Sequence, residues 1–384
     1  PKLYLEKNPP FSEFYLRKLA SLSKFDCLLS ISESSKREAE KYLEFDQECI
    51  FNISSACDEN LFASKLSNIK DDSLKTDYEY ILYSGAGDPR KNLCRLIEAY
   101  SLLSEELRDK YKLVFVGHLL PEELDQLKDW IAINHLSSKL VKILGYVSDE
   151  QLSRLYRNCR LFIFPSLHEG FGLPVLEAMA CGAPVIGSNT SSIPEIVGDA
   201  NALFDPFDVT NIASALEKAL VDERFRELLV VNSRNRSKLF SWKQTAENCI
   251  KAFEKSIFLK KKKNHNNKLM SYPRFIKRIK TIINSIEDAS YSDCLLKQIS
   301  SSIVLIKNQI RYIKCEHKVV ADKLVWRVEG PYDSSYSLAI LNRHFALALK
   351  ALDVDVRIFS TEGPGDYLPD LEFLQSHQER GDLN

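Results

Sequence analysis

The middle of the chain alternates short apolar runs with longer amphipathic segments. Six runs have the length and composition of buried strands: 80–86, 111–117, 141–147, 161–166, 184–189 and 201–206. Between them lie segments with the pattern of helices, such as 92–103, 122–133 and 149–159. Strands that alternate with helices predict an α/β domain with a doubly wound parallel sheet, in which ligands bind beyond the carboxyl ends of the strands.

Shorter α/β patterns lie on both sides of this region. Before it we expect helices at 11–24 and 32–43, the second capped by Ser32, strands at 27–32 and 49–54, and a polar linker at 64–77. After it we expect helices near 222–239 and 242–257, a basic stretch at 259–268, and a strand, helix and strand at 324–330, 337–352 and 354–360.

These patterns divide the chain into four segments. Residues 1–70 form the end of one α/β domain, and 71–258 form the domain with six strands. Residues 259–320 form a basic, partly helical linker, and 321–384 begin a further α/β domain. Because Pro1 stands in the middle of a pattern, we expect the chain to be a fragment of a longer protein.

Composition narrows the class of protein. The 384 residues carry a net charge of −1, so no global field favours nucleic acid. The nine cysteines form no C-x-x-C pair and no metal-ligand spacing with histidine, so we expect free thiols in the cytoplasm. No signal peptide is visible, and no apolar run approaches the ~20 residues that span a bilayer. The lysines at 260–263 favour a solvated linker; weak contact with the inner membrane face is the alternative.

The stretch HEGFGLPVLEAMACGAPV (168–185) predicts a tight loop followed by a short helix. Gly170 and Gly172 can take positive φ, so the chain can bend sharply there. Pro174 suits the first turn of a helix, and Gly182 suits its end. The start of such a helix attracts anions.

Two glutamates, Glu169 and Glu177, flank this anion site. Complementing the helix dipole is an equally good explanation for Glu177 alone. That explanation accounts neither for the second glutamate nor for the two glycines. A carboxylate accepts two hydrogen bonds from a vicinal diol, so a ligand that carries both phosphates and hydroxyls, such as a nucleotide sugar, explains the whole stretch.

The stretch GDPRKN (87–92) follows the first of the six strands. Arg90 and Lys91 precede a helix that Asn92 could cap, and together they could clamp a pyrophosphate. A solvated turn explains this stretch better when it is taken alone. The acidic stretch at the same edge of the sheet favours the clamp. His118 and His168 lie at that edge too, where ligand contact and simple packing are equally good explanations.

Three stretches together carry a family resemblance: SGAGDPRKNLCRLIEAY (84–100), LGYVSDEQLSRLYRNC (144–159) and FPSLHEGFGLPVLEAMACGAPVIGSNTSSIPEIVGDA (164–200). They resemble the donor-binding half of retaining glycosyltransferases of family four, whose GT-B architecture has two Rossmann-like domains. The resemblance covers about 80–255, and 11–62 is similar to the end of the acceptor-side domain. The block 326–349 resembles the start of a second such enzyme, which implies a fusion of two glycosyltransferases. Such fusions are often polysaccharide or O-antigen synthases that use GDP-mannose.

By position, the resemblance implies a role for each candidate residue. Glu169 would face the transferred hexose and is the catalytic candidate. The donor would be bound by Arg90 and Lys91 at the diphosphate, Glu177 at the ribose diol, Val147 at the base, and the backbone of Gly170, Phe171 and Gly172 at the sugar and phosphate, with Gly85 and Leu173 beside them. The resemblance implies no metal and no cofactor, and its acceptor is a glycan or lipid-linked glycan.

Two departures and two alternatives remain. Ala86 stands where many members of that family have an arginine, which leaves the clamp to Arg90 and Lys91. The family's acceptor-side histidine would precede Pro1, so we expect no transfer by this chain alone. A nucleotide-sugar epimerase on a related fold would need an acid/base set, and 178–200 shows none. A non-catalytic nucleotide-sugar-binding scaffold stays open for this chain.

Overall fold

The computed structural model describes residues 22, 25–43, 45–58, 62, 78–263, 325–330 and 355–360. They fall into two compact units, which are described separately. The sheet unit contains Ile31–Ser35 and the described part of Asn52–Thr245, and the flanking unit contains the rest. Among the described residues, no helix combines the length and the apolarity that a membrane span requires.

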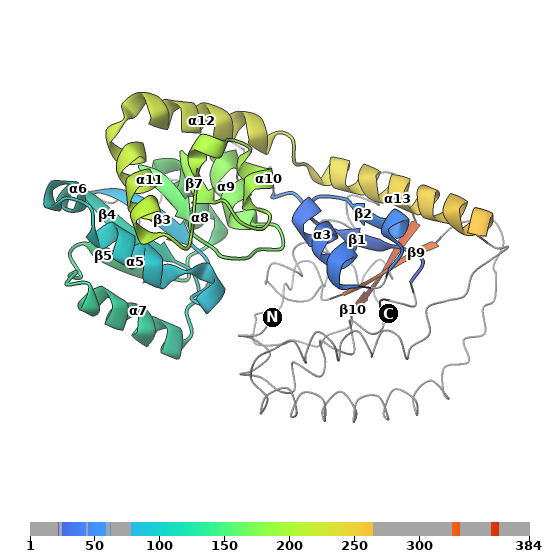
Figure 1. Cartoon of the computed structure of the whole chain (residues 1–384), viewed down its shortest axis with the longest axis horizontal. Helices are drawn as coiled ribbons and strands as arrows, with labels where there is room; N and C mark the ends of the chain where they lie inside the picture. The colour runs from blue at the N-terminus through green and yellow to red at the C-terminus, as the bar shows by residue number, and fades with distance from the viewer. Residues whose placement is uncertain are drawn as a thin grey trace. The chain divides into compact units, whose positions relative to one another are not determined.

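The sheet unit is built on six parallel strands (Figure 1). The strands are β3 (Glu79–Ser84), β4 (Tyr111–Val116), β5 (Val141–Gly145), β6 (Leu161–Phe164), β7 (Val185–Ser188) and β8 (Leu203–Phe204). Their order is β5-β4-β3-β6-β7-β8, so the sequence of strands reverses between β3 and β6. This is the Rossmann order, with its ligand-binding switch point at the reversal. The predicted doubly wound parallel sheet is confirmed.

Helices connect these strands in chain order. They are α5 (Leu93–Ser101), α6 (Glu105–Lys110), α7 (Pro121–Ile133), α8 (Asp149–Asn158), α9 (Leu173–Ala180), α10 (Ile193–Val197), α11 (Val209–Val221) and α12 (Glu223–Ser237). Helices α5, α7 and α11 pack in one group, and α8, α9, α10 and α12 pack in another. Two groups of helices are expected when connections alternate between the faces of a parallel sheet.

The core lies between the strands and these helices. All four residues of β6 are buried, as are residues 80–84 of β3, which is the pattern of strands covered on both faces. At the centre, the Tyr83 ring stacks on Phe164 at 6.0 Å and meets Phe115 at 5.7 Å. The end of β3 is therefore packed, through Tyr83, against both neighbouring strands, β4 and β6.

Three glycines join the carboxyl ends of β3, β4 and β5. Gly85 N–H donates to the Val116 carbonyl at 2.9 Å, and Gly117 N–H donates to the Gly145 carbonyl at 2.9 Å. Gly117 has a φ of +139°, and a Cβ added there would lie 2.2 Å from the Gly85 carbonyl oxygen. The two loops after β3 and β4 can approach this closely only because Gly117 has no side chain.

We expect Gly117→Ala to lower the free energy of unfolding by about 3 kcal/mol, because the new methyl group meets backbone that cannot move aside. Gly145→Ala is the matched control. It also has positive φ (+70°), but no atom lies within 4 Å of an added Cβ, so only about 1 kcal/mol should be lost. Urea unfolding measures the free energy of unfolding of both variants. Equal losses in the two variants would contradict the close approach of Gly117 to the Gly85 carbonyl.

Helix α11 was missed by the sequence analysis. Asp208 begins it as an N-cap that accepts from the amides of Thr210 and Asn211. Ile212, Leu216 and Leu220 are then buried on one face, at a spacing of four residues. An Asp cap followed by this period would have predicted the helix.

The flanking unit holds the remaining strands and α-helices. They are β1 (Leu28–Ser30), most of α3 (Glu33–Tyr42) and β2 (Ile50–Asn52), most of α13 (Trp242–Lys263), β9 (Val325–Gly330) and β10 (Asp355–Ser360). β9 and β10 pair in parallel, as a strand–helix–strand unit predicts. Helix α13 continues to Lys263, so the linker expected from residue 259 begins with helix. The predicted helices 11–24 and 337–352 and the linker 64–77 lie outside the described residues, apart from residue 22.

Candidate functional site

The loops after β3 and β6 meet at the switch point. Leu167 N–H donates to the Arg90 carbonyl at 2.7 Å. Asn92 does not cap α5 with its side chain, contrary to the prediction. Its amide group donates instead to the carbonyls of Pro165 and Pro206, at 3.1 and 2.7 Å. Asn92 thus fixes the loop after β6 relative to the loop after β3.

An ion pair joins the two predicted stretches. Lys91 Nζ lies 2.6 Å from Glu169 Oε1, and the side chains are only 14% and 12% exposed. Ser166 Oγ also donates to Oε1 at 2.7 Å. The Lys91 ammonium lies 5.5 Å from the centre of the Phe164 ring, on its face. Both hydrogen bonds end on Oε1, which orients the Glu169 carboxylate and leaves Oε2 outside this network.

Arg90 is held by its own turn. Its Nε donates to Asp88 Oδ1 at 2.9 Å, and the same oxygen accepts from the Arg90 backbone N–H. Residues Pro89–Lys91 form a single 3-10 turn that Asp88 caps. The Arg90 side chain is 40% exposed, whereas Lys91 is largely buried. The two predicted clamp cations therefore differ: Lys91 is fixed inside the site, and Arg90 lies at its rim.

The glycine loop bends at one glycine. Gly172 has a φ of +110° and begins α9 without a side-chain cap, with Pro174 in the first turn. A Cβ added at Gly172 would lie 2.7 Å from Ile193 Cδ1, so both the backbone and the space require glycine. The start of α9 keeps first-turn amides that no capping side chain covers, as an anion site requires.

Gly170 does not have the positive φ that the sequence analysis expected. Its carbonyl accepts from Ser32 Oγ at 2.7 Å and from Ser35 Oγ at 3.0 Å. These two bonds fix the peptide in an ordinary conformation. An added Cβ would lie 3.5 Å from Ile31 Cδ1 and 4.0 Å from Ser35 Oγ, which are ordinary contacts, so alanine fits there sterically.

Glu177 lies on α9 and is half-buried. Tyr156 on α8 donates to Glu177 Oε2 at 3.0 Å. Burial raises the pKa of Glu177 to about 7; the hydrogen bond from Tyr156 lowers it, and the charge of Asp149 raises it further. Neutral pH is therefore the range in which this carboxyl changes between a donor-capable acid and an acceptor-only carboxylate.

We expect Glu177→Gln to stabilise the folded protein at pH 8, by roughly 2–3 kcal/mol. The folded-state pKa is raised, so the folded protein loses stability as pH rises from about 4.5 to about 7. Glutamine removes this loss. Urea unfolding at pH 5 and pH 8 measures it, with Glu217→Gln on α11 as the control. A variant no more stable than the parent at pH 8 would contradict the raised pKa.

The other predicted residues lie around this edge. Val147 is partly buried against the core after β5, and Gly85 directly follows β3. The Phe171 side chain is buried and meets Phe240 edge-on at 5.7 Å, so only its backbone can contact a ligand. Leu173 is the first residue of α9. Within the described ranges, no group of three or more His, Cys, Asp or Glu is placed to hold a metal ion.

Three residues of the site were missed. Ser166 orients Glu169, and Ser84 and Tyr156 are hydrogen-bonded to each other beside Glu177. Ser84 and Tyr156 are separated by 72 residues, so no local spacing relates them. Only Ser166 had a usable indication, since it ends the apolar run 161–166 and lies three residues before Glu169.

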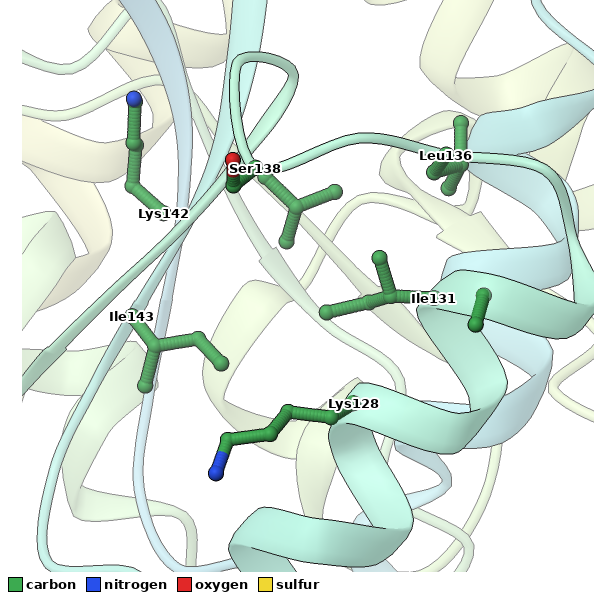
Figure 2. A pocket seen from close by; sticks show the side chains of 8 residues that line it. Lys128, Ile131, Leu136, Ser138, Lys142 and Ile143 are labelled. Carbon is green, nitrogen blue, oxygen red and sulfur yellow. The ribbon is translucent and has the colours of Figure 1, made fainter.

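A separate cavity of about 570 Å³ lies between α7 and the edge strand β5 (Figure 2). Its wall is formed by Lys128, Ile131, Ala132, Leu136, Ser138, Val141, Lys142 and Ile143. In Figure 2, Ile131 and Ile143 point towards each other across it. Because β5 is the edge strand and the switch point lies between β3 and β6, the cavity is distinct from the candidate site.

The sheet order and the two loops define a class of protein. They form the Rossmann-like half of a GT-B fold, with the glycine loop and the acidic residues at the switch point. Residues 65–236 match the family model described as "Glycosyl transferases group 1". In its fold and in residues 65–236, the chain is thus similar to GT-B glycosyltransferases.

Mannosyltransferases are among the similar sequences. The serotype-specific mannosyltransferase WbdA of Escherichia coli is 41% identical over 254 residues, which are 65% of this chain and 31% of WbdA. The O-antigen chain mannosyltransferase B of Escherichia coli is 35% identical over 238 residues, which are 61% of this chain and 62% of that protein. The chain thus spans less than two thirds of the length of these relatives.

Solved structures share the fold. Sucrose-phosphate synthase from Thermosynechococcus elongatus is 26% identical, with a TM-score of 0.53 over 63% of this chain and 61% of that chain. Anabaena HepE in complex with UDP and glucose is 20% identical, with a TM-score of 0.55 over 64% of this chain and 68% of that chain. Both similarities support the Rossmann-like GT-B fold.

Proposed function

We propose that this chain carries the donor site of a retaining mannosyltransferase of family four. The donor is GDP-mannose, and the acceptor is a growing O-antigen or related polysaccharide. The similarity to WbdA and to the O-antigen chain mannosyltransferase B supports the choice of sugar and pathway. The resemblance of 326–349 to the start of a second such enzyme supports a fusion of two transferases.

The observation that carries the proposal is the contact between Lys91 and Glu169 at the switch point. It places a cation suited to a diphosphate beside a carboxylate suited to sugar hydroxyls, from loops 78 residues apart. A nucleotide sugar presents its diphosphate and its hexose next to each other in the same way. Glu177, in the second turn of α9, would then face the ribose.

In this arrangement the protein acts on the leaving group. As the glycosidic bond breaks, negative charge develops on the departing diphosphate. Arg90, Lys91 and the amides at the start of α9 would stabilise that charge, which is where preorganised electrostatics contribute most. Glu169 would accept hydrogen bonds from the hexose hydroxyls through Oε2 and so orient the sugar, since its Oε1 already accepts from Lys91 and Ser166. A scaffold that binds a nucleotide sugar without transfer is the second candidate.

Nucleotide binding tests the proposal directly. Thermal shift with GDP, UDP, ADP and their sugars should show stabilisation, largest with GDP and GDP-mannose. We expect Arg90→Ala to weaken the best ligand by about 10- to 150-fold, the range for one charged hydrogen bond. Arg224→Ala, an exposed arginine on α12, is the matched control. No stabilisation by any of these nucleotides would refute the proposed function.

A further inference from the structure

Three side chains from three elements form one hydrogen-bonded chain beside the site. Ser84 Oγ at the end of β3 lies 2.6 Å from Tyr156 Oη on α8. Tyr156 Oη lies 3.0 Å from Glu177 Oε2 on α9. Ser84 is 4% exposed and Tyr156 is 0% exposed. Because water does not reach these hydroxyls, the two protein hydrogen bonds have no ready substitute.

The donor order in this chain depends on Glu177. A tyrosine has one proton to donate. When Glu177 is ionised it only accepts, so Tyr156 must donate to it, and Ser84 must then donate to Tyr156. Donation by Ser84 polarises the phenol and strengthens its bond to the carboxylate. Burial raises the pKa of Tyr156 well above its usual range, so the phenol keeps the proton that it donates.

The surroundings of Glu177 offer little else that favours the charge. Asp149 on α8 opposes ionisation. The Cys181 thiol follows α9, and Arg157 on α8 lies near enough for its charge to lower the pKa of that thiol. Glu195 on α10 accepts from the amides of residues 33 and 34, and Arg234 on α12 lies beside Gly182. Strands β6 and β7 contain no titratable residue. Among the described residues, Tyr156 is thus the side chain that donates a hydrogen bond to the carboxylate.

We propose that Tyr156 and Ser84 are positioning residues that keep Glu177 ionised and oriented to accept both hydroxyls of the donor ribose. This inference rests on the proposed function, because the ribose diol belongs to the nucleotide donor. It assigns a role in donor affinity to two residues that do not face the sugar. The Tyr156 bond occupies one side of Oε2, and the remaining lone pairs of the carboxylate receive the diol.

The expected consequence is a pH-dependent affinity. Binding needs the carboxylate, so affinity falls as pH drops through the pKa of Glu177, about 7. Loss of the Tyr156 bond should raise that pKa by ~1 unit. Affinity for a ribonucleotide should then fall about fivefold at pH 7 and stay unchanged at pH 9. A merely structural defect would weaken binding at every pH.

The first experiment needs no ligand. Carboxyl ¹³C resonances of glutamate are followed against pH, with the Glu177 resonance assigned by its loss in Glu177→Gln. Tyr156→Phe, which keeps the packing of the ring on Phe162, should move the midpoint up by ~1 unit. Ser84→Ala should move it in the same direction by a smaller amount. The matched control is Tyr80→Phe. The Tyr80 hydroxyl donates to the carbonyl of Leu155, which lies on α8 beside Tyr156. In this control the Glu177 midpoint should equal that of the parent.

The second experiment separates this inference from the proposed function. The best ligand among GDP, UDP and ADP, and its 2′-deoxy counterpart, are titrated by calorimetry from pH 6.5 to 9. The variant should lose affinity for the ribonucleotide near pH 7 only, and the deoxy form, with the same phosphates, should show no such difference. Failure of the parent to bind any nucleotide would refute the proposed function. The inference would be overturned if the parent bound the ribonucleotide but the Glu177 midpoint were the same in the parent, Tyr156→Phe and Ser84→Ala. If Tyr156→Phe does not fold, the Ser84→Ala midpoint alone decides.

Discussion

Lys91→Met should weaken binding of a nucleoside diphosphate about 100-fold and lower the free energy of unfolding by about 3 kcal/mol. The loss of affinity follows from removal of the one largely buried cation of the predicted clamp, 14% exposed. The loss of stability follows because Glu169 would keep its charge in a largely buried position without the cation 2.6 Å away. Calorimetry and urea unfolding measure the two effects.

The double variant Lys91→Met, Glu169→Gln separates the two effects. It removes both charges, so most of the lost stability should return, since no unpaired charge remains buried. Affinity for the diphosphate should stay as low as in Lys91→Met. Recovery of binding together with stability would show that Lys91 acts by holding the fold and not by contacting the phosphates.

Glu169→Gln should reduce sugar transfer by the whole protein by roughly 10²- to 10³-fold, the range for loss of one preorganised interaction with the transition state. Affinity for the nucleoside diphosphate should change less than about threefold, because the proposal assigns Glu169 to the hexose and glutamine can still accept from Lys91 and Ser166. Single-turnover transfer and calorimetry give the two numbers.

Glu177→Gln is the comparison for this division of roles. It should weaken the plain nucleoside diphosphate, because the ribose is part of every donor. Equal effects of both glutamine variants on nucleoside diphosphate affinity would contradict the assignment of Glu169 to the hexose and Glu177 to the ribose.

The fold could be predicted because its strands are continuous apolar runs between amphipathic helices. A strand such as 161–164 is buried on both faces, so its sequence shows the burial directly. The position of the candidate site could also be predicted, because the loops that follow parallel strands all lie at the same edge of the sheet. Helix α11 was not predicted, although its Asp208 cap and the four-residue spacing of its buried face are both present in the sequence.

The fine structure of the site could not be predicted in the same way. The hydrogen-bonded chain from Ser84 through Tyr156 to Glu177 joins residues 72 and 21 positions apart, and only the folded sheet brings them together. Asn92 looked like a helix cap, but two carbonyls from other loops compete for its side chain. Of the two glycines expected to bend the loop, only Gly172 takes positive φ, because serines fix Gly170 from outside the loop.

The central claim is that Lys91 binds the phosphate nearest the transferred sugar. The direct test is calorimetry of a nucleoside diphosphate and the corresponding monophosphate on the parent chain and on Lys91→Met. The parent should prefer the diphosphate by about 100-fold, which is the affinity that Lys91→Met is expected to lose and lies within the range of one charged contact to the second phosphate. Lys91→Met should lose most of that preference while its affinity for the monophosphate changes little. An undiminished preference for the diphosphate in Lys91→Met would contradict the account.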